Sequence, residues 1–115
     1  MFKILQLLES SRFIKTYNVS DFKQGANFYY FKIKASFKDG SILHIREYAS
    51  REERVYSYHW QDKDKRLICR WDNAPHYKEL KTFPHHKHIS EDVVEDSLEI
   101  DLESVLKHIE RIFEK

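Results

Sequence analysis

The amino-acid sequence predicts an α+β fold: a single antiparallel β-sheet of about five strands, with a short N-terminal helix and an amphipathic C-terminal helix on one face. Three observations lead to this expectation. Apolar and polar residues alternate in several segments, turn residues separate these segments, and apolar residues recur at helical spacing near the C-terminus. The chain has 115 residues, which is the usual length of one domain, so we expect a single domain over residues 1–115.

Three elements are expected at the N-terminal end of the chain. Residues 1–10 carry apolar side chains at helical spacing, with Phe2 and Leu8 on one face, and should form the short helix. Residues 12–19 are apolar enough for a first strand. Residues 20–27 contain Asp, Gly and Asn and are expected to form a loop.

The clearest strand covers residues 28–38, where apolar residues alternate with lysines. An Asp-Gly pair ends it and marks a hairpin. A three-residue loop with Gly40 in the left-handed conformation would place Leu43 beside Ala35, on the apolar face. A two-residue loop would turn Leu43 toward the lysines, because a slip of one residue reverses every side chain. We therefore predict the three-residue loop, residues 38–40.

Two further strands are expected at residues 54–61 and 66–72, joined by a polar turn. An even-length loop that pairs Trp60 with Leu67 would align their aromatic and apolar residues. The opposite face of this hairpin then carries four polar residues, which are Ser57, His59, Arg70 and Asp72. A sheet face of this kind is not a core face, so it is a candidate functional surface.

The segment 73–89 holds two prolines and four histidines and is expected to be irregular. A loop of this length without structure of its own is usually functional or disordered. Its histidines are His76, His85, His86 and His88.

The C-terminal helix is expected to begin after Asp101, a residue type that suits the N-cap position. Six apolar residues follow at helical spacing: Leu102, Val105, Leu106, Ile109, Ile112 and Phe113. Their spacing gives the helix one apolar face, which is expected to cover the sheet.

Charge is distributed unevenly along the chain. Residues 91–115 contain nine acidic and three basic residues, whereas residues 1–90 contain ten acidic and seventeen basic ones. A basic body with an acidic C-terminal helix suits a polyanionic ligand such as RNA on the body, although ordinary surface charge gives the same count.

Cysteine use and hydropathy bear on the compartment. Cys69 is the only cysteine, so neither an internal disulfide nor a paired-cysteine metal site is possible, which fits a reducing compartment. Residues 1–10 are too short and polar for a signal peptide, and no apolar run approaches the roughly 20 residues of a membrane helix. We expect a cytoplasmic protein with no membrane partner and no cofactor.

The histidines between residues 59 and 88 could cleave RNA without a metal. Such cleavage needs a base for the 2′-hydroxyl proton, an acid for the departing 5′-oxygen, and a cation for the charge that builds on phosphorus. Candidates for acid and base are His59, His76, His86 and His88. Arg70 suits the phosphate because its planar guanidinium matches it, and Asp72 could orient a histidine. Tyr58 and Lys87 are expected to contact RNA, although the alternation suggests that Tyr58 faces the core.

Two other interpretations remain open for the same histidines. Each could be a polar loop residue that only hydrogen-bonds the backbone. Alternatively, the His-His-x-His run with His76 or His59 could supply three or four ligands to zinc, a spacing that permits a metal site without identifying one.

Three motifs resemble the signature of the TumE family: Tyr56-Ser-Tyr-His-Trp-Gln, Arg70-Trp-Asp-Asn-Ala-Pro-His76 and Thr82-Phe-Pro-His-His-Lys-His88. The resemblance covers about residues 28–88. It implies a growth-inhibiting toxin of a two-gene toxin–antitoxin module, with a helix-turn-helix antitoxin as partner. The matching positions that it implies for the site are His59, Arg70, Asp72, His76, His85, His86 and His88.

Together these observations favour a metal-independent endoribonuclease toxin with RNA as substrate, by analogy with other small toxins. The alternatives are a non-catalytic protein that binds RNA, the ribosome or the antitoxin, and a histidine-rich metal-binding domain.

Overall fold

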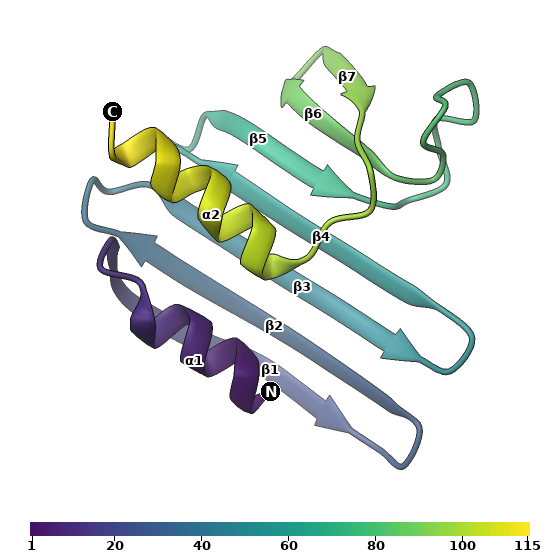
Figure 1. The fold of residues 1–115 in the computed structure, drawn as a ribbon, viewed down its shortest axis with the longest axis horizontal. Coiled ribbons are helices and arrows are strands. Elements are labelled where there is room, and N and C mark those ends of the chain that lie inside the picture. The colour runs from purple at the N-terminus through teal and green to yellow at the C-terminus, as the bar shows by residue number, and fades with distance from the viewer.

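One seven-stranded sheet forms the body of the molecule, and every strand pairs antiparallel with its neighbour in sequence (Figure 1). The computed structural model describes residues 1–115. Its elements are α1 (Phe2–Ser10), β1 (Ile14–Gln24), β2 (Phe28–Phe37), β3 (Ile42–Ser50), β4 (Arg54–Gln61), β5 (Leu67–Asp72), β6 (His86–Ser90), β7 (Val93–Asp96) and α2 (Leu102–Phe113). The predicted α+β class with one antiparallel sheet and two terminal helices is confirmed.

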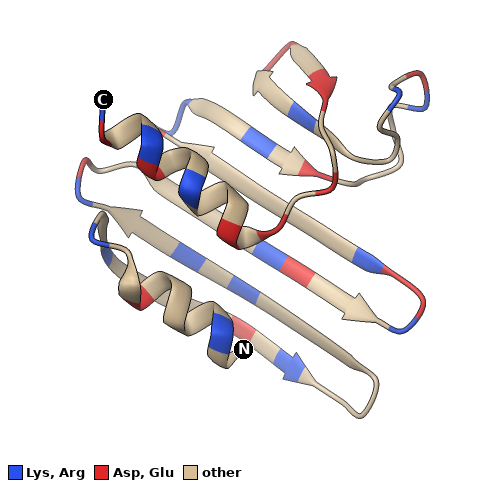
Figure 2. Ribbon diagram, viewed as in Figure 1, with Lys and Arg blue, Asp and Glu red and all other residues tan.

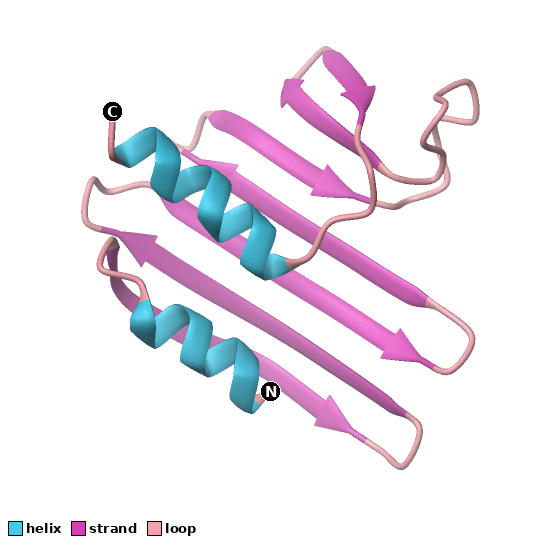
Figure 3. Cartoon of the chain, viewed as in Figure 1, coloured by secondary structure: helices cyan, strands magenta, loops and turns pink.

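Both helices lie on the same face of the sheet (Figure 3). Alternation along β2 to β5 turns the apolar side chains toward these helices, and the core forms between the two layers. From α2 the core receives Leu102, Val105, Leu106 and Ile109. From α1 it receives Leu8, whereas Phe2, expected on the same buried face, is exposed.

The N-terminus of α2 is capped as predicted. Asp101 is extended, and its carboxylate accepts a hydrogen bond of 2.9 Å from the backbone N–H of Ser104. This bond satisfies one of the unpaired donors of the first turn and lowers the pKa of Asp101. α1 and α2 have nine and twelve residues, and neither has the length and apolar character of a membrane-spanning helix.

The β2–β3 hairpin has the predicted three-residue loop. Gly40 has a φ of 91°, and the backbone N–H of Phe37 donates to the carbonyl of Ser41. Ala35 consequently lies opposite Leu43. A side chain at Gly40 would be strained at this φ, which explains why glycine occupies the position.

Two predictions of irregular structure are wrong. β1 continues to Gln24, although residues 20–27 were expected to form a loop. It lies at the edge of the sheet, where polar residues on both faces are tolerated. The histidine-rich segment also ends in a strand, β6, which pairs with β5, and β7 follows it at the opposite edge. With these two strands the sheet has seven strands, whereas about five were expected.

The register of the β4–β5 hairpin also differs from the expected one. Trp60 lies opposite Cys69 instead of Leu67, because the turn closes with Asp62 bonded to Arg66 and a bulge between Trp60 and Gln61 shifts the pairing by one more residue. A shift of two residues leaves every side chain on its expected face, since the side chains of a strand return to the same face at every second residue. His59 therefore still lies on the same face as Arg70.

Candidate active site

The sheet face away from the helices carries two rows of polar side chains that run across neighbouring strands. Directly paired residues of antiparallel strands share a face, so the register defines each row. The first row is Lys34, His44, His59, Arg70 and His88, and the second is Lys32, Arg46, Ser57, Asp72 and His86. We call this surface the open face.

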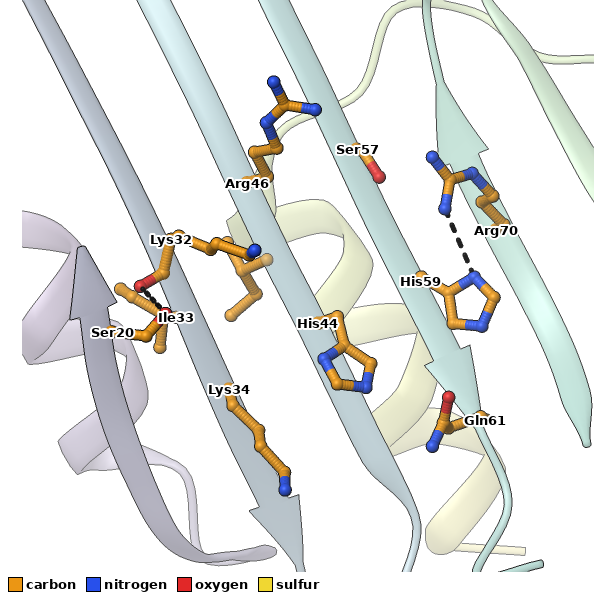
Figure 4. A pocket seen from close by; sticks show the side chains of 11 residues that line it. Ser20, Lys32, Ile33, Lys34, His44, Arg46, Ser57, His59, Gln61 and Arg70 are labelled. Carbon is orange, nitrogen blue, oxygen red and sulfur yellow. Dashed lines mark hydrogen bonds between the residues drawn. The ribbon is translucent and has the colours of Figure 1, made fainter. Parts of the chain in front are cut away.

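Arg70 lies at the centre of the first row, with His59 on one side and His88 on the other. Its Nη1 lies 3.4 Å from Nδ1 of His59. Because a guanidinium only donates, Nδ1 of His59 is the acceptor, and the proton of the neutral ring lies on Nε2. Figure 4 shows the Nδ1 edge of the His59 ring facing the guanidinium of Arg70.

Asp72 contacts several side chains of the two rows at once. Its side chain is buried, with 4% of the residue exposed. Oδ1 accepts the backbone N–H of Ala74 at 3.0 Å and lies 2.9 Å from Nε2 of His86. Oδ2 accepts Nε of Arg70 at 2.9 Å and lies 3.6 Å from Nε2 of His88. One carboxylate therefore orients three of the side chains expected at the site.

His86 supports the site from below the surface. The residue is 1% exposed, and the ring of Tyr77 packs over it at 4.7 Å between centroids. Its Nδ1 donates to the carbonyl oxygen of Pro84 at 3.0 Å, while its Nε2 faces Asp72. A ring held at both nitrogens and closed off from solvent cannot reach a substrate, so His86 positions Asp72.

The three more accessible histidines of the open face all have lowered pKa values. Partial burial is the first cause for His59, followed by the charge of Arg70 and then of His44. For His44 burial is followed by Lys34 and Lys32. For His88 burial also dominates, and the carboxylate of Asp72 opposes it. At neutral pH these rings are therefore mainly neutral and able to accept protons.

A shallow groove of about 420 Å³ crosses the open face from β1 to β5 (Figure 4). Its polar lining includes Lys32, Lys34, His44, Arg46, Ser57, His59 and Arg70. Four of these, the two lysines with His44 and Arg46, were not among the expected site residues. The alternation of β2 and β3 already places them opposite the apolar side chains, and this was the signal that could have identified them.

Four expected site residues lie elsewhere. His85 stacks on Tyr56, a core-facing residue, and forms a hydrogen bond of 2.8 Å with its hydroxyl. His76 is exposed in the loop between β5 and β6. Tyr58 is 0% exposed and bonds to Glu47 and Arg54, so its ring is not available to an RNA base. Lys87 pairs with Trp71 on the opposite face from the flanking histidines.

Metal coordination would use a different set from the expected His-His-x-His run. Asp72, His86 and His88 each offer one ligand atom, and these atoms lie within 4.8 Å of one another. A cation here would have to replace the direct contact between Asp72 and His86.

Charge also differs between the faces. Figure 2 shows lysine and arginine on the strands and acidic residues in the segment that leads into α2. The acidic residues of α2 lie on the side of the sheet opposite the groove, whereas Glu91, between β6 and β7, is close enough to raise the pKa values of His59 and His88 against the effect of burial.

The family model described as Toxin TumE matches residues 4–114. Neither a curated protein nor a solved structure matches the chain. Since the family match spans almost all of the sequence, the chain belongs to the TumE toxin family, and a toxin of this kind implies an antitoxin partner.

Proposed function

We propose that this toxin is a metal-independent endoribonuclease that cleaves RNA on the open face. One observation carries the proposal. His59, Arg70 and His88 lie directly opposite one another on three neighbouring strands, β4, β5 and β6. Strands are spaced about 4.8 Å apart, so the two histidine backbones are separated by about 10 Å, with the guanidinium between them. A phosphodiester bound to Arg70 would have an imidazole on each side.

The reaction follows from these positions. His59 removes the proton of the 2′-hydroxyl through Nδ1, which becomes free when the guanidinium of Arg70 turns to the phosphate. The 2′-oxygen then forms a bond to phosphorus. The bond between phosphorus and the 5′-oxygen breaks, and His88 gives that oxygen a proton. The products are a 2′,3′-cyclic phosphate and a free 5′-hydroxyl. Arg70 stabilises the negative charge that builds on the phosphoryl oxygens during the attack.

Asp72 and His86 are positioning residues in this scheme. Asp72 holds the guanidinium of Arg70 through Nε, which leaves Nη2, and the N–H of Nη1 that does not face His59, for a phosphate. The same carboxylate lies 3.6 Å from His88 and partly offsets the lowering of its pKa by burial, and the negative charge of a bound phosphate would further favour the protonated acid. The burial of His86 keeps Asp72 fixed while the substrate binds.

The lowered pKa of His59 suits a base, because the ring is neutral when RNA arrives. A phosphate placed between His59 and Arg70 reverses the local charge. The same ring can then hold a proton more readily once it has taken one from the 2′-hydroxyl, which assists the attack.

The decisive experiment uses RNA with a 5′ label and a matched strand in which 2′-deoxynucleotides replace the ribonucleotides. The proposal expects cleavage of the first strand only, with products that carry cyclic phosphate and 5′-hydroxyl ends. Cleavage of the deoxy strand, or 5′-phosphate products, would contradict a 2′-hydroxyl attack.

Site variants then test the assignment. His59→Ala, Arg70→Ala and His88→Ala should each lower the cleavage rate by about 10²–10⁴-fold, the usual contribution of an acid–base group. His76→Ala is the matched control, because His76 is an exposed loop residue. His44→Ala tests a competing pair, since the rings of His44 and His59 lie 6.1 Å apart. If His44→Ala abolishes cleavage and His88→Ala does not, the acid is wrongly assigned.

A non-catalytic role is the second candidate, because the cations of the groove would bind RNA whether or not it is cleaved. It predicts RNA binding that falls with salt, growth inhibition in cells, and intact RNA on the gel. Loss of toxicity in Arg70→Ala but not in His59→Ala would favour this function.

We further propose that the antitoxin partner is a helix-turn-helix protein that covers the open face. The groove carries lysine, arginine and histidine side chains and no carboxylate of its own lining. An inhibitor that presents acidic groups there would compete with RNA for the same cations and associate quickly at low salt.

A further inference from the structure

Beside the two polar rows, the open face carries an aromatic row. Tyr30 lies directly opposite Tyr48 on the neighbouring strand, and Tyr48 lies opposite Val55. Phe28 stacks on Tyr48 with ring centroids 6.2 Å apart and an angle of 29° between the planes. Phe28 and Val55 are 41% and 42% exposed, so this end of the face presents apolar surface to solvent.

Two cations lie beside Tyr30, one of the rings of the aromatic row. The ammonium of Lys23 lies 5.7 Å from the centre of the Tyr30 ring, and the guanidinium of Arg46 lies 5.9 Å from it. Lys23 also pairs with the carboxylate of Asp21 at 3.8 Å. Rings flanked by cations suit a ligand that has both flat apolar groups and negative charges.

The aromatic row is continuous with the groove. Arg46 lines the groove and also reaches Tyr30, so it joins the two surfaces. Tyr48, Arg46 and His44 follow one another on the same face of β3. Four residues of a strand span about 13 Å, so the distance from the aromatic row to the histidine row is within reach of a short oligonucleotide.

We propose that the aromatic row is a base-stacking platform for single-stranded RNA, formed by Tyr30, Tyr48 and Phe28. This inference rests on the proposed function, because the platform would bind the bases that neighbour the phosphate held by Arg70. Unpaired bases stack on exposed aromatic rings, whereas the bases of a duplex are already stacked on one another. The platform therefore makes single-stranded RNA the substrate and contributes affinity without reading base edges.

The test measures binding to a catalytically impaired chain, His59→Ala, by fluorescence anisotropy with a labelled single-stranded RNA. Two other ligands are the same RNA with abasic residues and the same RNA in a duplex. The intact single strand should bind more tightly than either. Tyr48→Leu keeps the apolar contact but removes the ring, and should weaken binding of the intact strand by about 5- to 100-fold.

Two controls make the comparison specific. Tyr48→Leu should leave the affinity for abasic RNA nearly unchanged, because no base is present to lose its stacking partner. Phe22→Leu should leave binding of every ligand unchanged. Phe22 is also an exposed aromatic residue, but it lies opposite core-facing Phe31 and so points to the other face. Circular dichroism and urea unfolding confirm that each variant is folded.

Failure of the platform is distinguishable from failure of the proposed function. If Tyr48→Leu and Tyr30→Leu bind intact and abasic RNA like the parent chain, while Arg70→Ala still loses affinity for both, the platform is wrong and the proposed function stands. The platform is also overturned if the tyrosine variants lose only the antitoxin, because the row then serves a protein partner. If the unaltered chain neither binds nor cleaves RNA, both proposals fail.

Discussion

Replacing Asp72 with asparagine should destabilise the fold, because the substitution removes a buried charge from between its partners. Asparagine has the same shape, yet its amide group carries one oxygen and one nitrogen. Oδ1 of Asp72 accepts the N–H of Ala74 and faces His86, while Oδ2 accepts from Arg70. In either orientation of the amide of Asp72→Asn, its NH₂ group faces another donor, which is the N–H of Ala74 or the Nε–H of Arg70.

The size of the effect can be worked from the burial of each partner. A hydrogen bond to a charged group contributes about 1.5–3 kcal/mol, and removal of one member of a buried ion pair costs about 3–5 kcal/mol. His86 is fully buried, so water does not screen its contact with the carboxylate. The side chain of Arg70 is 39% exposed, so water screens its share. We expect a loss of about 2–4 kcal/mol in the free energy of unfolding for Asp72→Asn.

Urea unfolding followed by tryptophan fluorescence measures this loss. With a slope of about 2 kcal/mol per molar urea, the midpoint should fall by about 1–2 M. Total stabilities of about 5–15 kcal/mol leave the variant folded in the absence of urea. Asp64→Asn is the matched control: Asp64 is exposed in the β4–β5 turn, and its midpoint should change by less than about 0.25 M. An equally small shift for Asp72→Asn would refute the conclusion that the contacts of the Asp72 carboxylate stabilise this part of the fold.

Three further predictions concern pH, metal and partner. The pKa of His59 lies below its ordinary value of 6.5 in the folded chain, so the unfolded chain binds more protons as pH falls below that value. Stability should therefore be greatest above pH 6.5 and fall on acidification, and His59→Gln should reduce this slope in urea titrations at several pH values. The chain should retain full cleavage after dialysis against a chelator, and elemental analysis that finds one zinc per chain, lost in His88→Ala, would move that histidine into a ligand role. Arg70→Glu should weaken binding of both RNA and antitoxin in salt-dependent titrations, and an unchanged antitoxin affinity would place the inhibitor on another surface.

Much of the sheet could be predicted because alternation reports burial directly. The strands β2 to β5 have one face against the helices, so their apolar residues recur with period two. The same rule correctly placed His59 and Arg70 on one face. It also placed Tyr58 in the core, so its expected contact with RNA conflicted with the pattern of its own strand.

Strands that no helix covers give no such signal. In β6 the residues that face Asp72 and Arg70 are histidines, so the strand reads His-Lys-His-Ile-Ser and looks like a loop. Its pairing is stabilised by polar contacts whose partners lie in a distant segment. The bulge beside Trp60 is likewise hidden, because no glycine stands there to mark it in the sequence.

His44 shows a different reason for a missed residue. The alternation of β3 places Leu43 on the apolar face and His44 on the other, but it does not show which side chains of the neighbouring strands lie beside His44. Only the register connects His44 to His59 on the next strand and to Lys34 on the previous one. A candidate site made of one residue from each of several strands becomes visible once the strands are paired.

The position of α2 in the chain has a consequence for synthesis of the toxin. Every strand is made before α2, yet the apolar face of the sheet, with Tyr58, Trp60 and Trp71, is covered only when α2 packs on it. A nascent or truncated chain that stops before Leu102 already holds all the histidines of the open face but lacks the layer that stabilises them. We expect such fragments to aggregate or be degraded and to be harmless to the cell, so that toxicity begins only when the ribosome has released the last helix.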